Sequence, residues 1–141
     1  MTAPRDNWAG VAVALVEHGY QELGFWYPVL RLRELGAAVF VAGPAGEETY
    51  RSQLGYPVIP DGDLAAAAAR KPDVLIVPGG NAGRLLAASA AFRDLVAAQR
   101  ARGQLVAVVG EPGDVAGDIC CATPDDLPEL VPELLKAMRG V

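Results

Sequence analysis

Four ionisable side chains could transfer protons if the folded chain brought them to one place. Glu17, His18 and Glu22 follow the first short apolar run of the sequence, and Glu111 follows a later one. When two carboxylates share a partly buried site, one of their pKa values rises, so that one group can donate a proton while the other accepts one. Histidine titrates near neutral pH and suits either role. We therefore predict these four as candidate catalytic residues; the alternative is that they are solvated loop residues.

The glycine-rich turn PGGNAGR is a second candidate feature, because it follows an apolar run and opens a helical pattern. Backbone N–H groups in such a turn can hold a carboxylate, a phosphate or an oxyanion. We predict Gly79, Gly80, Asn81 and Gly110 as ligand-binding residues for a small molecule, with Arg84 as the counter-charge of an anion. The alternative is that the glycines only make a tight turn. The spacing matches neither the dinucleotide motif nor the P-loop, so no cofactor is predicted.

The only two cysteines, Cys120 and Cys121, are adjacent in the sequence. A disulfide between neighbours would be strained and would close almost no loop. We predict that both pack as small hydrophobic side chains, with a thiol that faces the pocket as the alternative. His18 is the only histidine, which excludes a histidine-rich metal site, and no metal is predicted.

The composition limits the possible partners. The chain has 141 residues, of which 52% are hydrophobic and 21% charged, and its net charge is −5. This length predicts one domain over residues 1–141. Nucleic-acid binding needs clustered Lys and Arg, which are absent, and no run resembles a membrane span or a secretory signal. We therefore predict a cytoplasmic protein with neither a nucleic-acid nor a membrane partner.

The elements that must position the candidate residues follow from the apolar pattern. Short apolar runs ended by turn residues predict strands buried on both faces of a sheet; they cover residues 10–16, 37–43, 73–80, 104–110 and 118–122. Helical spacing predicts helices between and after them, over residues 23–35, 65–70, 89–103 and 123–138, the last interrupted at Pro132. The fold class is therefore α/β: a single doubly wound, mostly parallel five-stranded sheet of order 2-1-3-4-5 with helices on both faces.

Several stretches in the same order resemble the DJ-1/ThiJ/PfpI superfamily, which is related to the class I glutamine amidotransferase fold. They are EHGYQELGFWYPVLRLRELGAAVFVAGP, LGYPVIPDGDL, PDVLIVPGG and GDICCATPDDLPELVPELLKAM. Together they cover nearly the whole chain. The resemblance implies a Cys-His pair on the turn after the fourth strand and an acid on the first helix.

This sequence departs from the family pattern at each of those positions. The resemblance places Gly110 where the cysteine is expected, Glu111 where the histidine is expected, and Gly24 where the acid is expected. The chain also passes from this turn almost directly to the last strand, as if an intervening segment were deleted. Cysteine-dependent amidase, deglycase or protease activity is therefore not expected.

An aromatic cluster on the first helix predicts a homodimer. Phe25, Trp26 and Tyr27 are consecutive, with Tyr20 nearby, and neighbours on a helix point about 100° apart, so they cannot all face the core. The remaining aromatic side chains either line the crevice or meet a second subunit. Because members of the resembled family commonly pair subunits around this helix, we prefer the homodimer.

Two functions remain open at this point. The first is a divergent small-molecule enzyme that uses acid–base chemistry for cyclisation, isomerisation, hydration or dehydration. The second is a catalytically inactive homodimeric binding or interaction module of the same fold.

Overall fold

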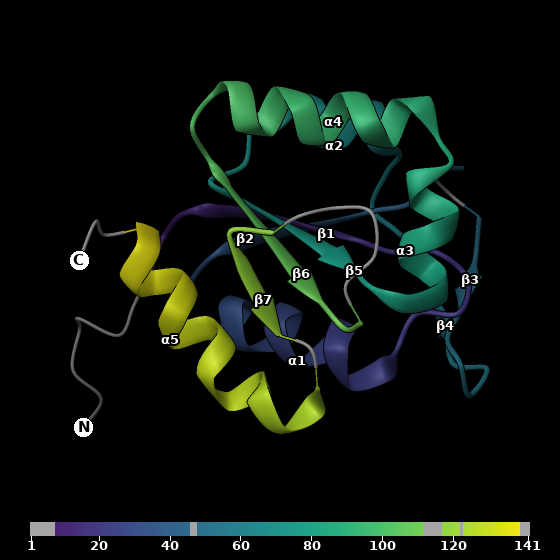
Figure 1. The fold of residues 1–141 in the computed structure, drawn as a ribbon, viewed down its shortest axis with the longest axis horizontal. Coiled ribbons are helices and arrows are strands. Elements are labelled where there is room, and N and C mark those ends of the chain that lie inside the picture. The colour runs from purple at the N-terminus through teal and green to yellow at the C-terminus, as the bar shows by residue number, and fades with distance from the viewer. Residues whose placement is uncertain (1–7, 46–47, 112–116, 122, 139–141) are drawn as a thin grey trace.

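The computed structural model describes residues 8–45, 48–111, 117–121 and 123–138. Its main sheet is parallel and has the order β2-β1-β5-β6-β7 (Figure 1). The strands are β1 (Val11–Leu15), β2 (Ala38–Ala42), β5 (Val74–Pro78), β6 (Leu105–Val109) and β7 (Ile119–Cys121). This confirms the predicted order 2-1-3-4-5 and places the carboxyl ends of all five strands at one edge.

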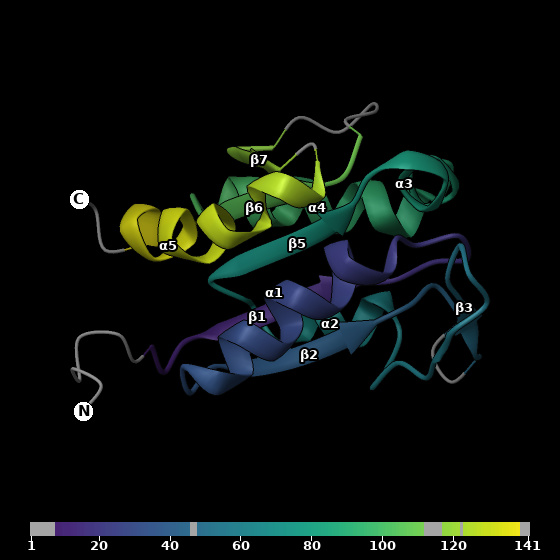
Figure 2. The ribbon, with the colours of Figure 1, turned by 90° about the horizontal axis from the view of Figure 1, so that it is seen from below.

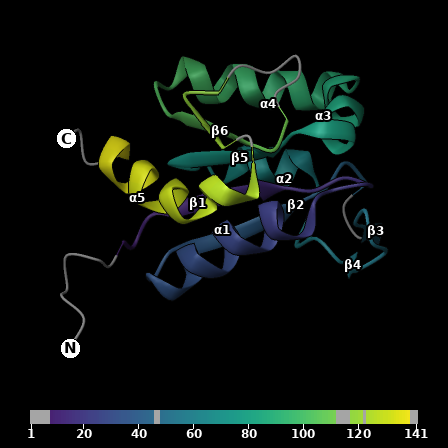
Figure 3. The same cartoon turned by 60° about the horizontal axis from the view of Figure 1, so that its bottom comes forward.

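Helices cover both faces of the sheet, as the alternating pattern predicted. Helices α1 (Glu22–Glu34) and α5 (Leu127–Met138) lie side by side on one face (Figures 2 and 3). The other face is covered by α2 (Leu64–Ala69), α3 (Gly80–Ala87) and α4 (Ala90–Ala101). A 3-10 turn, η2 (Pro124–Asp126), leads into α5.

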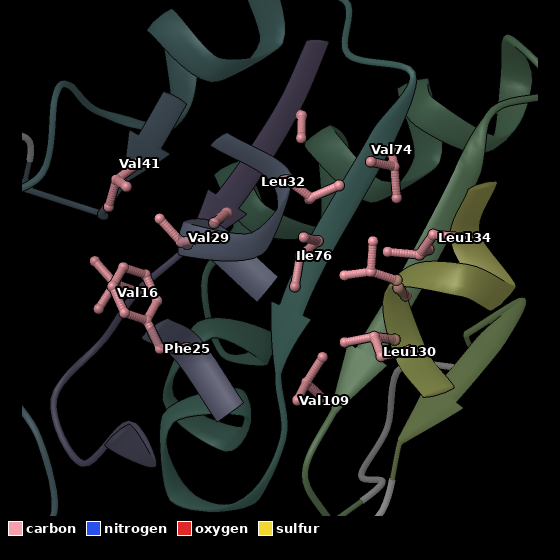
Figure 4. Close-up of a cluster of buried hydrophobic side chains, with 14 of the residues drawn as sticks. Val16, Phe25, Val29, Leu32, Val41, Val74, Ile76, Val109, Leu130 and Leu134 are labelled. Atoms are coloured by element: carbon pink, nitrogen blue, oxygen red, sulfur yellow. The ribbon is translucent and has the colours of Figure 1, made fainter. Parts of the chain in front are cut away.

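Each central strand contributes side chains to two separate cores, because successive residues of a strand point to opposite faces. In β1, Ala12 and Ala14 face the core under α1 and α5, whereas Val13 and Leu15 face the core under α2 and α4. Figure 4 shows the first of these cores, where side chains of α1 and α5 meet those of the sheet. Two-sided burial explains why the strands appear in the sequence as continuous apolar runs.

One helix differs from its sequence prediction. Pro132 was expected to interrupt the last helix, yet α5 continues through it from Leu127 to Met138. Proline removes one backbone donor, but the Pro132 ring is exposed. The buried stripe that includes Leu130 and Leu134 packs on the sheet without a break. Packing of the apolar face therefore outweighs the lost hydrogen bond.

A small hairpin, which the sequence did not predict, lies beside the carboxyl edge of the sheet. It consists of β3 (Tyr50–Arg51) and β4 (Pro57–Val58), which pair antiparallel. The Gly19 N–H donates to the Arg51 carbonyl at 2.8 Å, and the Gln53 N–H donates to the Tyr20 carbonyl at 2.9 Å. The hairpin is thus attached to the segment that joins β1 to α1.

The connection from β6 to β7 is short, as the sequence predicted. Strand β6 ends at Val109 and β7 begins at Ile119, and the two pair in parallel. Parallel neighbours are usually joined by a dozen or more residues with a helix among them.

Among the helices of the described ranges, none is long and apolar enough to cross a lipid bilayer.

Candidate functional site

A partly enclosed cavity of about 170 Å³ lies where four strands of the sheet end. The last residues of β1, β5, β6 and β7 all contribute to its wall: Leu15, Pro78, Val109 and Cys121. The remaining lining residues come from loops, helix starts and one sheet position, and are Gln21, Gly24, Phe25, Gln53, Ile76, Gly79, Gly80, Gly110, Glu111, Thr123 and Leu127. This is the place where doubly wound α/β proteins bind their ligands.

Four of the predicted site residues meet at this cavity. Gly79, Gly80, Gly110 and Glu111 all line it. The Gly79 N–H donates to the Val109 carbonyl at 2.8 Å, and the Gly80 N–H donates to the Glu111 carbonyl at 3.0 Å. The two turns that follow β5 and β6 are therefore joined by backbone hydrogen bonds.

Both turns require glycine, for different reasons. A Cβ added at Gly79 would lie 2.3 Å from the Glu111 carbonyl oxygen, which real side chains do not tolerate. Gly110 has a φ of +116°, a conformation that residues with a Cβ rarely adopt. The floor of the cavity is thus bare backbone at these two positions.

Asn81 does not line the cavity, although it directly follows the glycine pair. Its side-chain oxygen accepts a hydrogen bond from the Arg84 guanidinium. Arg84, predicted as the counter-charge of an anion, is therefore bound to a neighbour on its own helix.

Three of the predicted catalytic residues lie outside the cavity lining and contact the hairpin or its neighbourhood. A Glu22 carboxylate oxygen accepts the Leu54 N–H at 2.7 Å. His18 Nδ1 accepts the Arg51 N–H at 3.2 Å, and Glu17 Oε1 accepts the His18 N–H at 2.8 Å. The structure therefore does not bring them to Glu111, and their catalytic role stays a prediction.

Cys121 is the only thiol at the cavity among the described residues. Its side chain is 3% exposed, and its sulfur lies 3.4 Å from the Thr123 carbonyl oxygen. Burial, followed by the negative charge of Asp126, raises the pKa of the Cys121 thiol. Cys120 is exposed, so the prediction that both cysteines pack as buried side chains is wrong for Cys120. Both predicted alternatives thus hold for Cys121, which packs in the core and also faces the pocket.

Sequence reasoning missed the polar residues at the cavity that come from neighbouring loops. Gln21 is the N-cap of α1 and accepts the Gly24 N–H through its side chain. Gln53 belongs to the unpredicted hairpin, and Thr123 begins the last helical segment. Glutamine is not among the residue types preferred at a helix N-cap, so the sequence indicated neither Gln21 nor Gln53. No group of three or more His, Cys, Asp or Glu residues in the described ranges could hold a metal ion.

The fold and the cavity define a doubly wound α/β protein with its candidate site at the carboxyl edge of the sheet. A model of the DJ-1/PfpI family matches residues 10–115. Protein dj-1beta of Drosophila melanogaster is 30% identical over 128 residues, which is 85% of this chain and 68% of that protein. The chain belongs to the DJ-1/PfpI family.

Further comparisons agree on the fold. The Parkinson disease protein 7 homolog of Danio rerio is 33% identical over 100 residues, 70% of this chain and 53% of that protein. The crystal structure of Drosophila DJ-1beta superposes with a TM-score of 0.81 at 22% identity, covering 95% of this chain and 92% of the other. An oxidised Toxoplasma gondii DJ-1 gives 0.80 at 21% identity, covering 92% and 91%. The chain spans only about half the length of the zebrafish relative that it matches.

Proposed function

We propose that this chain is a homodimeric binding module for a small molecule, which occupies the cavity without covalent chemistry. One observation carries the proposal: the cavity has the position and enclosure of a ligand site but lacks a paired acid and base. Among its described lining residues, Glu111 is the only carboxylate, and the Cys121 thiol is held in its neutral form by burial.

The geometry favours binding over acid–base catalysis. An acid–base enzyme needs two proton-transfer groups within reach of one substrate atom. Glu17, His18 and Glu22 are instead engaged around the hairpin, as their hydrogen bonds show. The thiolate, not the thiol, is the nucleophile, so the neutral Cys121 side chain does not support covalent catalysis either.

The homodimer proposal rests on an apolar surface formed by α1 and the hairpin. Exposed or half-exposed side chains from both elements make up this α1–hairpin surface, namely Leu23, Trp26, Tyr27, Leu30, Leu54 and Tyr56. Exposed apolar side chains that gather on neighbouring elements mark interaction sites in soluble proteins. We further propose a cytoplasmic location, since both cysteines are free thiols.

A small-metabolite screen by NMR tests the binding function. Ligands are expected to shift the amide signals of Gly80 and Gly110 and to be recovered chemically unchanged after long incubation with the protein. Gln53→Trp should block binding because the residue is exposed at the cavity wall, whereas Gln53→Ala at the same position should not. Formation of product from a bound molecule would refute the proposal and restore the acid–base enzyme.

A further inference from the structure

The glycines at the cavity have no N–H group left to offer to a ligand. Four glycines line it, and each donates within the protein. Gly24 donates to the Gln21 side chain, Gly79 to Val109, Gly80 to Glu111, and Gly110 to the Cys121 carbonyl at 2.7 Å. An oxyanion site requires such donors to be free and aimed at the ligand. These four glycine N–H groups are therefore not available to an anion.

The charged groups at the cavity have one sign. Glu111 carries the only formal charge among the described lining residues, which include no Lys, Arg or His. It is exposed and so lies at the mouth rather than in the floor. Asp126 does not line the cavity, but its negative charge acts on Cys121, which does. The formal charges of Glu111 and Asp126 are thus both negative.

Helix N-termini act in the opposite direction. Helices α1 and α3 both begin beside the cavity. A helix start is equivalent to roughly half a positive charge, carried by its free N–H groups. At α1 the Gln21 side chain caps the Gly24 N–H, and at α3 the Gly80 N–H is bound to Glu111. At each start, one backbone donor is therefore already bound within the protein.

The inner wall is apolar. Leu15, Phe25, Ile76, Val109 and Leu127 all line the cavity and are buried. Its volume of about 170 Å³ is below the roughly 300 Å³ at which pockets for drug-sized ligands begin. The wall suits a short hydrocarbon group, while the lining also includes the Glu111 carboxylate and the polar residues Gln21 and Gln53.

We propose that the ligand is a small organic cation, a primary ammonium group carried on a short apolar body. The body occupies the space among the buried side chains, and the ammonium group lies at the mouth beside Glu111. This inference rests on the proposed binding function and names the class of ligand for the same cavity.

Three molecules of the same shape and different charge test the proposal: n-butylammonium, n-butanol and butyrate. Each is titrated into isotope-labelled protein, and the dissociation constant is taken from the amide shifts of Gly80 and Gly110. We expect n-butylammonium to bind several-fold more tightly than n-butanol, and butyrate to bind most weakly. Added salt should weaken only the ammonium, because the Glu111 charge is exposed to screening.

Two variants test whether Glu111 causes the preference for n-butylammonium over n-butanol. Glu111→Gln should make n-butylammonium and n-butanol equal without changing the affinity for n-butanol. Glu129→Gln, which removes an exposed carboxylate of α5 that does not line the cavity, should leave the preference intact. Butyrate binding as tightly as the ammonium, or a preference that survives in Glu111→Gln, overturns the ligand class. If all three molecules bind with the same affinity, the proposed ligand class is wrong but the binding function stands. If none of the three shifts the lining amide signals, the proposed binding function is wrong too.

Discussion

The turn after β6 carries Gly110, whose backbone conformation favours glycine. A Cβ at Gly110 would lie 3.4 Å from the Gly79 backbone, which is an ordinary contact. The obstacle at Gly110 is therefore its φ of +116°, not the available space. Gly79 has the opposite problem: its backbone conformation is extended, but a Cβ would collide with the Glu111 carbonyl.

Replacing each glycine by alanine separates the energetic cost of the positive φ at Gly110 from the cost of the steric collision at Gly79. Gly110→Ala should lower the free energy of unfolding by about 1–2 kcal/mol, the cost of a left-handed conformation for a residue with a Cβ. Gly79→Ala should cost more, about 3 kcal/mol, because the two joined turns must move apart. Urea denaturation of each variant measures both values.

Gly55→Ala is the matched control for the stability lost through an unfavourable backbone conformation alone. Gly55 has a φ of +89°, and no atom lies within 4 Å of an added Cβ. Gly55→Ala should therefore lower the free energy of unfolding by about as much as Gly110→Ala does. A smaller loss for Gly79→Ala than for Gly110→Ala would contradict the close approach of the turns.

The direction in which the cysteines point could not be predicted from the sequence. Alternation along a strand says only that Cys120 and Cys121 face opposite sides. Which side is covered depends on α5, and α5 buries Cys121 while Cys120 stays exposed. The sequence predicted buried packing for both thiols, which is confirmed for Cys121 and wrong for Cys120.

At the scale of elements, the hairpin of β3 and β4 could not be predicted from the sequence because each strand has only two residues. No periodicity can be detected over so short a run. Tertiary contacts define the hairpin instead: the Tyr20 hydroxyl donates to the Tyr56 carbonyl at 2.9 Å, and Glu22 accepts the Leu54 N–H. Residues that looked like catalytic acids in the sequence thus position a loop.

Glu22 makes the attachment of the hairpin dependent on pH. Hydrogen bonds from the Ser52 side chain and then from the Leu54 N–H hold the pKa of Glu22 below its ordinary value of 4.5. A lowered pKa means that the contact is present above the ordinary pKa and is lost as pH falls through the lowered one. The Leu54 amide signal should therefore shift with a midpoint below pH 4.5 in an NMR titration.

Glu22→Gln should abolish this titration of the Leu54 signal. Glu34→Gln, at the other end of α1 and paired with Arg31, should leave it unchanged. A midpoint above pH 4.5, or one that persists in Glu22→Gln, would show that another group controls the hairpin.

At the scale of the whole molecule, the sheet order could be predicted because it depends on a long-range regularity. Buried strands that alternate with helices restrict the topology to a few solutions, and the order β2-β1-β5-β6-β7 is one of them. The site depends instead on where loops converge. Glu111 and the glycines were found because they directly follow strands, whereas Gln53 reaches the cavity from a loop that no pattern indicates.

The proposed dimer is also a property of the whole molecule, since α1 and the hairpin join in one surface. Leu30 of α1 is 56% exposed, and Leu54 of the hairpin is 77% exposed. Leu54 is held close to the start of α1 by its hydrogen bond to Glu22. A two-fold interface would bury the same residues of both protomers and remove this apolar area from water.

A charge placed in the α1–hairpin surface should therefore dissociate the dimer. Leu30→Asp introduces an unpaired carboxylate into the proposed interface from each protomer, and it should raise the dimer dissociation constant by at least about 100-fold. Leu85→Asp is the matched control, because Leu85 lies on α3 and is 52% exposed, close to the exposure of Leu30. Light scattering after size-exclusion chromatography over a range of concentrations measures both variants. A monomeric parent chain, or equal dissociation by the two substitutions, would show that this surface does not pair the subunits.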